Sequence, residues 1–177
     1  MPRRVIASSP EASSGQLSTA DAATARTTSA RSRRKTPCVG ICSTTYGDLV
    51  CRGCKRYAHE IIQWNAFSAK QRSTIWLRLA ELRDGATEEL VTVTARDRLA
   101  EECRSRGIPA EQIEKTSTAS LAYELLCRSL SQPQSLANAG VRLRDGLSPL
   151  DAVKSIDQAF LARSTAHYER AFKTPLV

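Results

Sequence analysis

Apolar side chains recur at helical spacing along most of the chain beyond residue 55. In residues 55–64, Tyr57, Ile61 and Trp64 follow one another at positions i, i+4 and i+7. This spacing places the three side chains on one face of a short helix. The pattern predicts a helix directly after a segment that is rich in cysteine.

A second helix is predicted over residues 67–85, and its two ends carry recognisable signals. Ser68 can cap the first turn, and Gln71 is placed to complete a capping box. Gly85 is expected to end the helix, because glycine readily adopts the left-handed conformation found at many helix ends. One face of this helix carries an apolar stripe that consists of Ile75, Leu79 and Leu82, with Trp76 beside it.

Three further helices are predicted in residues 87–107, 110–130 and 148–172. Gly107 is expected to end the first of them, and the third has Ser148 as its cap and Pro149 at its first position. Residues 91–93 alternate in a strand-like manner, but the stretch is too short to predict a strand. Val153, Ile156, Phe160 and His167 lie near one face of the last helix.

These patterns predict a mainly α fold with three parts. Residues 1–35 are rich in Ser, Thr, Ala and Arg and show no apolar periodicity, so we expect a disordered tail. Residues 36–84 form a small four-cysteine metal-knuckle module with two short helices, and residues 85–177 form a helical region. No apolar run reaches the length of a transmembrane helix, so no membrane segment is predicted.

The net charge of +8 belongs to the first half of the chain. Residues 1–37 carry +5, residues 38–84 carry +3, and residues 85–177 hold twelve basic and twelve acidic residues. The basic tail could attract nucleic acid, although a solvated tail explains it more simply. No secretory signal is recognised, so we expect a cytoplasmic protein. An Arg-rich and Ser-rich start also resembles an organellar transit peptide, and the organelle matrix is the alternative location.

Four of the six cysteines lie within seventeen residues, in the pattern Cys38-x3-Cys42-x8-Cys51-x2-Cys54. Two close pairs joined by a short loop are typical of thiolate ligands around one tetrahedral metal centre. Disulfides are disfavoured in a reducing compartment. A thioredoxin-like pair needs a strand–helix context that is not recognisable here. The predicted metal site therefore consists of Cys38, Cys42, Cys51 and Cys54, and it suits either zinc or an iron–sulfur cluster.

Several other residues are candidates for supporting this centre. Arg52, Lys55 and Arg56 surround the second cysteine pair, and their charge could offset a four-thiolate centre. His59 could lie in a second shell or on the surface of a helix. The remaining cysteines, Cys103 and Cys127, sit on helical stripes, where we expect them to behave as buried small hydrophobes. Trp64 and Trp76 are expected in the core.

Residues 36–79 resemble a small bacterial family catalogued as domain of unknown function 1289. The matching positions are Pro37, Cys38, Gly40, Cys42, Cys51, Gly53, Cys54, Arg56, Glu60, Ile61, Trp64 and Ser68. Residues 48–50 depart from the family pattern, as do Phe67 and Gln71. None of these departures removes a predicted ligand. The family is commonly labelled a predicted iron–sulfur protein, so the resemblance implies that such a cluster is an option here.

The predicted function is that of a small, non-enzymatic metal-binding protein. In this interpretation the four-cysteine site stabilises the module, and the helical region binds a protein partner. An iron–sulfur electron-transfer or sensor protein is the first alternative, and a nucleic-acid-associated protein that uses the basic tail is the second. No arrangement of Ser, His or acidic residues indicates a catalytic motif.

Overall fold

The structure, a computed structural model, describes residues 36–131 and 134–173. Within these residues it is mainly α-helical, as predicted, with seven α-helices and two short strands. The predicted disordered tail of residues 1–35 and its nucleic-acid interpretation lie outside the described residues. The elements in chain order are η1 (Ser43–Tyr46), α2 (Ala58–Ile62), α3 (Ala69–Glu88), β1 (Val91–Val93), α4 (Arg96–Ser105), α5 (Ala110–Lys115), α6 (Thr118–Arg128), α7 (Gln134–Asn138), β2 (Val141–Leu143), η2 (Arg144–Gly146) and α8 (Pro149–Phe172).

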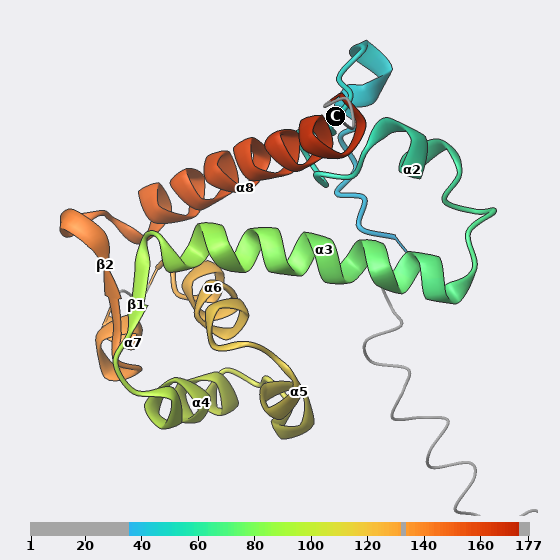
Figure 1. The fold of residues 1–177 in the computed structure, drawn as a ribbon. Helices are drawn as coiled ribbons and strands as arrows, with labels where there is room; N and C mark the ends of the chain where they lie inside the picture. The colour runs from blue at the N-terminus through green and yellow to red at the C-terminus, as the bar shows by residue number, and fades with distance from the viewer. Residues whose placement is uncertain (1–35, 132–133, 174–177) are drawn as a thin grey trace, which may run out of the picture. The chain divides into compact units, whose positions relative to one another are not determined.

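The two long helices, α3 and α8, run antiparallel and side by side (Figure 1). Helix α6 packs against both of them, and α4 packs on α6. Helix α2 and the cysteine segment lie near the start of α3 and the end of α8, whereas β1, β2 and α7 lie at the opposite ends of the two long helices (Figure 1). No helix within the described ranges is both long and apolar enough to cross a membrane.

Both helix starts with predicted caps are confirmed. The Ser68 hydroxyl accepts a hydrogen bond from the Gln71 backbone N–H, and the Gln71 side chain accepts one from the Ser68 backbone N–H. Ser148 caps α8 in the same way, with Pro149 as the first helical residue. These contacts are local in sequence, and they satisfy backbone donors that would otherwise lack partners.

The predicted end of the second helix at Gly85 is wrong, because α3 continues to Glu88. Gly85 instead provides space for α8. A Cβ atom at this position would lie 2.9 Å from a guanidinium nitrogen of Arg163, whose side chain also pairs with Glu89. The predicted boundary between residues 84 and 85 lies inside α3, and the described residues from Pro37 onward belong to one compact unit.

The predicted helix over residues 87–107 begins later than expected, at Arg96. Val91–Val93 form a strand after all, because β1 pairs antiparallel with β2 some fifty residues further on, with Val91 opposite Leu143. A three-residue strand depends on this distant partner, which local periodicity does not reveal. The end at Gly107 is confirmed, and Gly107 has the left-handed φ of 77°. The predicted helix over residues 110–130 is divided into α5 and α6.

The main apolar core lies among α4, α6, the start of α8 and the two strands. Cys103 is fully buried there, as predicted, whereas Cys127 is exposed, because it lies on the outer side of the last turn of α6. Trp64 is buried in a smaller cluster with Ile75 and Leu79. Trp76 lies outside this cluster and is 38% exposed, so its predicted core position is wrong. The main core consists of Ala86, Val91, Leu99, Ala100, Cys103, Ile108, Ile113, Leu121, Ala122, Leu125, Leu126, Leu136, Ala139, Val141, Ala152 and Ile156.

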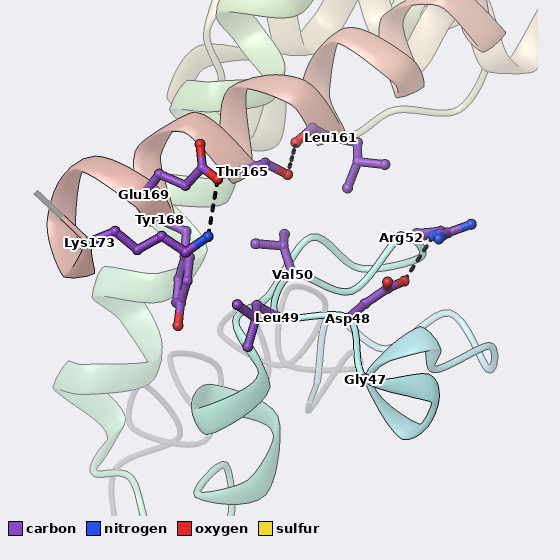
Figure 2. Close-up of a pocket in the computed structure, with 10 residues that line it drawn as sticks. All are labelled: Gly47, Asp48, Leu49, Val50, Arg52, Leu161, Thr165, Tyr168, Glu169 and Lys173. Carbon is purple, nitrogen blue, oxygen red and sulfur yellow. Dashed lines mark hydrogen bonds and ion pairs between the residues drawn. The ribbon is translucent and has the colours of Figure 1, made fainter.

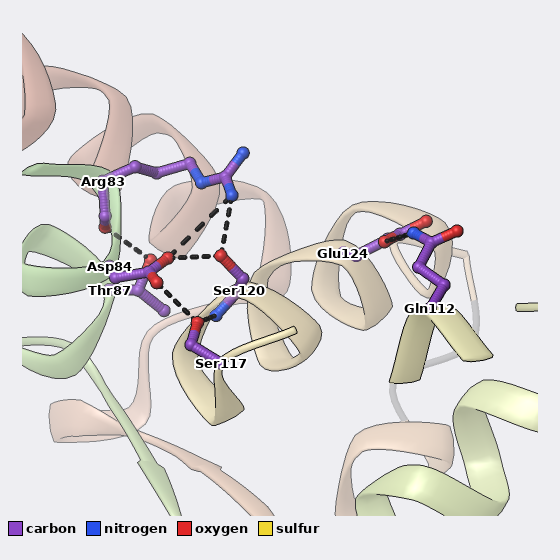
Figure 3. Close-up of polar contacts among 7 residues, drawn as sticks. All are labelled: Arg83, Asp84, Thr87, Gln112, Ser117, Ser120 and Glu124. Carbon is purple, nitrogen blue, oxygen red and sulfur yellow. Dashed lines mark hydrogen bonds and ion pairs between the residues drawn. The ribbon is translucent and has the colours of Figure 1, made fainter. Parts of the chain in front are cut away.

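A cluster of polar side chains joins α3 to the start of α6 (Figure 3). The two carboxylate oxygens of Asp84 accept hydrogen bonds from the Ser117 and Ser120 hydroxyls, and Arg83 also donates to Ser120. Ser117 is at the same time the N-cap of α6. Arg83, Asp84, Ser117 and Ser120 therefore attach the start of α6 to α3.

Candidate metal centre

The second cysteine pair lies in the turn of a tight hairpin. Val50 forms an antiparallel bridge with Tyr57, and the Cys51 backbone N–H donates to the Arg56 carbonyl at 2.9 Å. The Lys55 backbone N–H donates to the Cys51 carbonyl at 2.8 Å, which closes the turn. Lys55 has a φ of 58°, a left-handed conformation that is uncommon for a residue other than glycine. The hairpin thus holds Cys51 and Cys54 on either side of one turn.

Cys51 is almost completely buried within the turn. Burial by itself raises the pKa of the thiol. Hydrogen bonds from the backbone N–H groups of Cys54, Ser43 and Gly53, together with contact with the Cys54 side chain, outweigh burial and lower the pKa from 9.0 to about 7. Such donors stabilise the thiolate, which is the form that binds metals.

The neighbouring sulfur, that of Cys54, is also buried and contacts Arg56. Burial raises the pKa of the Cys54 thiol, and the guanidinium of Arg56 opposes this effect. The Arg56 Nε lies 3.4 Å from the Cys54 Sγ. The central carbon of the guanidinium lies over the ring of Trp64, at 4.6 Å from its centroid. Arg56 therefore contacts both the sulfur and the indole.

The first cysteine loop packs directly against this hairpin. The carbonyl oxygen of Ile41 lies 3.7 Å from the Cys51 sulfur. A Cβ atom at Gly53 would lie only 2.7 Å from the Ile41 oxygen and 2.8 Å from a methyl group of Val39. Gly53 is thus required by the close approach of two backbones. The loop between Cys38 and Cys42 and the turn between Cys51 and Cys54 are in contact.

The sulfurs of the first pair have their own hydrogen-bond partners. The Gly40 backbone N–H donates to the Cys38 sulfur at 3.5 Å, and the Cys42 sulfur lies 2.9 Å from the hydroxyl of Thr44. Cys38 is exposed and Cys42 is half-buried. In residues 36–131 and 134–173, no three Cys, His, Asp or Glu side chains are grouped closely enough to hold a metal ion. All six cysteines are free thiols, and the four-ligand centre stays a prediction.

The predicted supporting residues occupy very different surroundings. Arg52 is exposed and pairs with Asp48. The Lys55 side chain is buried, and its ammonium contacts Asp157 of α8 and the carbonyl of Gly53. Arg56 contacts a cysteine sulfur, as described above. His59 is exposed and its ring packs on Tyr57 and Phe172 rather than against a cysteine.

The hairpin is attached to the end of α8 by contacts that the sequence did not indicate. The Tyr57 hydroxyl lies 2.6 Å from the Nδ1 of His167, and its ring also packs against Tyr168 and Phe172. On its other side the Tyr57 ring faces the guanidinium of Arg78, which pairs with Glu60. Tyr57 and His167 are 110 residues apart, so no spacing rule links them.

A shallow pocket of about 260 Å³ lies where the hairpin meets α8 (Figure 2). Leu49, Val50 and Leu161 provide its apolar walls. Two ion pairs lie at its edges, one between Arg52 and Asp48 and the other between Lys173 and Glu169. The cysteine side chains do not line this pocket. It belongs to the junction with α8 rather than to the predicted metal centre.

Comparison with known proteins locates the family resemblance in this part of the chain. Residues 36–83 match the model of a family described as "Protein of unknown function (DUF1289)". The match extends from the first cysteine loop into α3, so the predicted resemblance is confirmed for this segment. No curated protein and no solved structure matches the chain.

Proposed function

We propose that Cys38, Cys42, Cys51 and Cys54 hold one metal centre that stabilises a non-enzymatic interaction module. The donor set of four thiols suits a zinc ion or an iron–sulfur cluster. The binding free energy of such a centre, about 10–16 kcal/mol for structural zinc, stabilises the folded state when the metal is bound. The four cysteine sulfurs would hold the metal centre, and the residues around them would orient the sulfurs.

The observation that carries this proposal is the packing of the first cysteine loop against the turn that holds the buried Cys51 and Cys54. The Ile41 carbonyl oxygen lies 3.7 Å from the Cys51 sulfur, and backbone hydrogen bonds outweigh burial and lower the pKa of the Cys51 thiol to about 7. The Cys54 sulfur accepts hydrogen bonds from the backbone and the side chain of Arg56. Donors of this kind commonly orient thiolate ligands and balance their charge. Binding of all four sulfurs to one ion further requires an adjustment of the Cys38–Cys42 loop, which already touches Cys51.

The interaction part of the proposal is supported by exposed apolar side chains. Tyr46 is 90% exposed and Ile41 75% exposed, and both lie next to the cysteines. Trp76 and Leu77 are exposed on α3. Exposed apolar side chains that form one continuous patch commonly serve protein–protein contacts, and the proposal assigns this role to these side chains. A protein partner is therefore part of the proposed function.

Metal analysis of the full-length chain, purified without oxygen, tests the proposal. We expect about one zinc ion per chain, or iron with acid-labile sulfide and a brown colour. Replacing any of the four cysteines by serine should strongly reduce the metal content. The matched control is Cys127→Ser, because Cys127 is an exposed cysteine outside the site. Unchanged metal content in Cys38→Ser or Cys42→Ser would remove that residue from the ligand set.

The same experiment separates the alternatives. Iron with sulfide would favour an electron-transfer or sensor protein, and zinc would favour a structural centre. The contact between the Cys51 and Cys54 side chains also suits a dithiol couple. Suppose that the wild-type protein contains no metal and that its mass rises by that of two hydrogens on reduction. This result would favour a dithiol–disulfide couple of Cys51 and Cys54 over the metal centre.

A further inference from the structure

Arg56 differs from the other buried basic side chains near the cysteines because it has no carboxylate partner. The ammonium of Lys55 pairs with Asp157, and the guanidinium of Arg78 pairs with Glu60. Among the residues that the structure describes, no carboxylate lies within 4.0 Å of the Arg56 guanidinium, yet Arg56 is only 3% exposed. A guanidinium is permanently charged, so its burial is costly unless an anion lies nearby.

The nearest group that can supply the negative charge is the sulfur of Cys54. Arg56 contacts it through Nε, and the guanidinium also lies over the Trp64 ring. A cation is attracted to the face of an indole ring, but the ring is uncharged and does not neutralise the cation. Four thiolates around Zn²⁺, or around an oxidised four-iron cluster, carry a net charge of −2. The positive charge of Arg56 would neutralise one of these two negative charges, and the other would be neutralised by the remaining surroundings.

We propose that Arg56 is the buried counter-cation of the four-thiolate centre, held against Cys54 by Trp64, and that it is a positioning residue for metal binding. This inference rests on the proposed function. It separates Arg56 from Arg52, which, like Arg56, lies two positions from Cys54 in the sequence. Arg52 is exposed and already neutralised by Asp48, so it contributes little to the charge balance of the buried sulfurs.

Metal affinity tests this assignment, with Arg52 as the matched control. The full-length protein is titrated with Zn²⁺ in competition with a chromophoric chelator. We expect Arg56→Gln to weaken zinc binding by about 10–100-fold, as is typical for the loss of a group that contacts a metal ligand. Arg52→Gln removes the same charge from the exposed side of the same turn and should change the affinity at most a few-fold. Equal effects of the two substitutions would overturn the inference.

A spectroscopic readout separates the electrostatic role from a merely structural one. In protein loaded with Co²⁺, the thiolate-to-cobalt charge-transfer bands report the electron density on sulfur. Loss of the guanidinium should raise that density, so the bands of Arg56→Gln should shift to lower energy, and those of Arg56→Lys should shift less. Arg56→Met retains the apolar stem against Trp64 and should shift as Arg56→Gln does. Bands that stay in place in all three variants would overturn the inference even if affinity falls.

The two proposals fail in different ways. If the wild-type chain binds neither Zn²⁺ nor Co²⁺ and carries no cluster, the metal centre and the role of Arg56 are both overturned. If the wild type binds metal and the Arg56 variants bind it equally well with unchanged bands, only the role of Arg56 is overturned. If the wild type instead carries a cluster, Arg56→Gln should make its reduction potential more negative, and an unchanged potential would overturn the inference.

Discussion

The cysteine segment and the helical core bury very different kinds of side chain. Beyond α2, the buried polar side chains among the described residues are all uncharged, namely Thr87, Ser120, Ser129, Ser135 and Ser164, and the sixteen members of the main core are apolar or cysteine. The hairpin and α2 bury Lys55, Arg56 and Glu60 alongside their apolar residues. Apolar burial stabilises a core without any added group, whereas buried charges are stable only when they are paired. We therefore expect the helical core to be stable by itself and the cysteine segment to depend on the proposed metal centre, which would balance Arg56, the one of these three charges without an oppositely charged side chain among the described residues.

Removal of the metal should produce the largest difference between the two regions. In the proposed function, a metal-binding free energy of about 10–16 kcal/mol stabilises the cysteine segment directly and the helical core only indirectly. After treatment of the metal-loaded protein with a strong chelator, we expect the amides of residues 38–57 to lose hydrogen-exchange protection. The amides of α6, which lie in the apolar core, should retain most of theirs. Hydrogen exchange followed by mass spectrometry measures both regions in the same sample.

Two results would contradict this expectation. Equal loss of protection in α6 would mean that the whole unit depends on the metal. Unchanged protection in residues 38–57 after complete metal removal would mean that the hydrogen bonds of the hairpin suffice by themselves. Treatment of the Cys51→Ser variant with the same chelator is the control for direct effects of the chelator on exchange.

A cavity in the apolar core should have the reverse effect. Leu125 is fully buried on α6. Leu125→Ala removes three buried carbon atoms and leaves a cavity, so the free energy of unfolding should fall by about 2–5 kcal/mol. Urea denaturation followed by circular dichroism measures this loss. The control is Leu130→Ala. Because Leu130 is 42% exposed, this substitution should lower the free energy of unfolding far less.

The metal content of folded Leu125→Ala should match that of the wild type, because Leu125 belongs to the main core, and the described members of that core include no residue of the hairpin or the first cysteine loop. A decrease in metal content in proportion to the lost stability would show that the two regions fold as one cooperative unit. The contrast between an independent core and a metal-dependent segment would then be lost.

The features that the sequence predicted correctly depend on neighbouring residues. The cap formed by Ser68 and Gln71 involves residues three positions apart, and the turn between Cys51 and Cys54 spans four residues. Gly85 was misread because its role depends on Arg163, which lies 78 positions further along the chain. Hydrophobic periodicity contains no information about such distant contacts.

The candidate site shows the same division. The sequence placed Arg52, Lys55 and Arg56 near the second cysteine pair, and chain continuity ensures that they lie there. Their orientations are determined by partners from elsewhere: Asp157 of α8 in the case of Lys55, and Trp64 in the case of Arg56. Sequence distance therefore grouped three basic residues that the structure separates into an exposed one, an ion-paired one and one that faces sulfur.

A smaller effect is expected at the ion pair that links the two regions. Asp157→Asn leaves the buried ammonium of Lys55 without its carboxylate, which typically costs about 1–3 kcal/mol. Because Lys55 follows Cys54 directly, release of bound metal to a chelator should also become faster. Stopped-flow measurement of metal release tests this coupling. Glu169→Gln, which breaks an exposed pair with Lys173 on the same helix, is the control and should leave the release rate unchanged.

The smallest effect concerns pH, and here the thiols of the two regions should respond in opposite directions. Burial raises the pKa of Cys103 from 9.0 to about 11. A thiol whose pKa is higher in the folded state contributes stability that is fully present below pH 9 and is lost as the pH rises toward 11. Burial raises the pKa of Tyr123 to about 12, so Tyr123 also lowers the stability of the folded state as the pH rises. The metal-binding thiols must instead be deprotonated, so the cysteine segment should lose its metal on acidification.

Urea midpoints of the wild type and Cys103→Ala, measured between pH 8 and pH 11, isolate the contribution of Cys103. The midpoint of the wild type should fall more steeply with rising pH than that of the variant, while Tyr123 affects both proteins equally. Parallel curves would show that Cys103 does not ionise on unfolding in this range. Metal content followed from pH 8 into strong acid completes the comparison, because retention of metal where protons outcompete a metal ion for thiolates would argue against cysteine ligands.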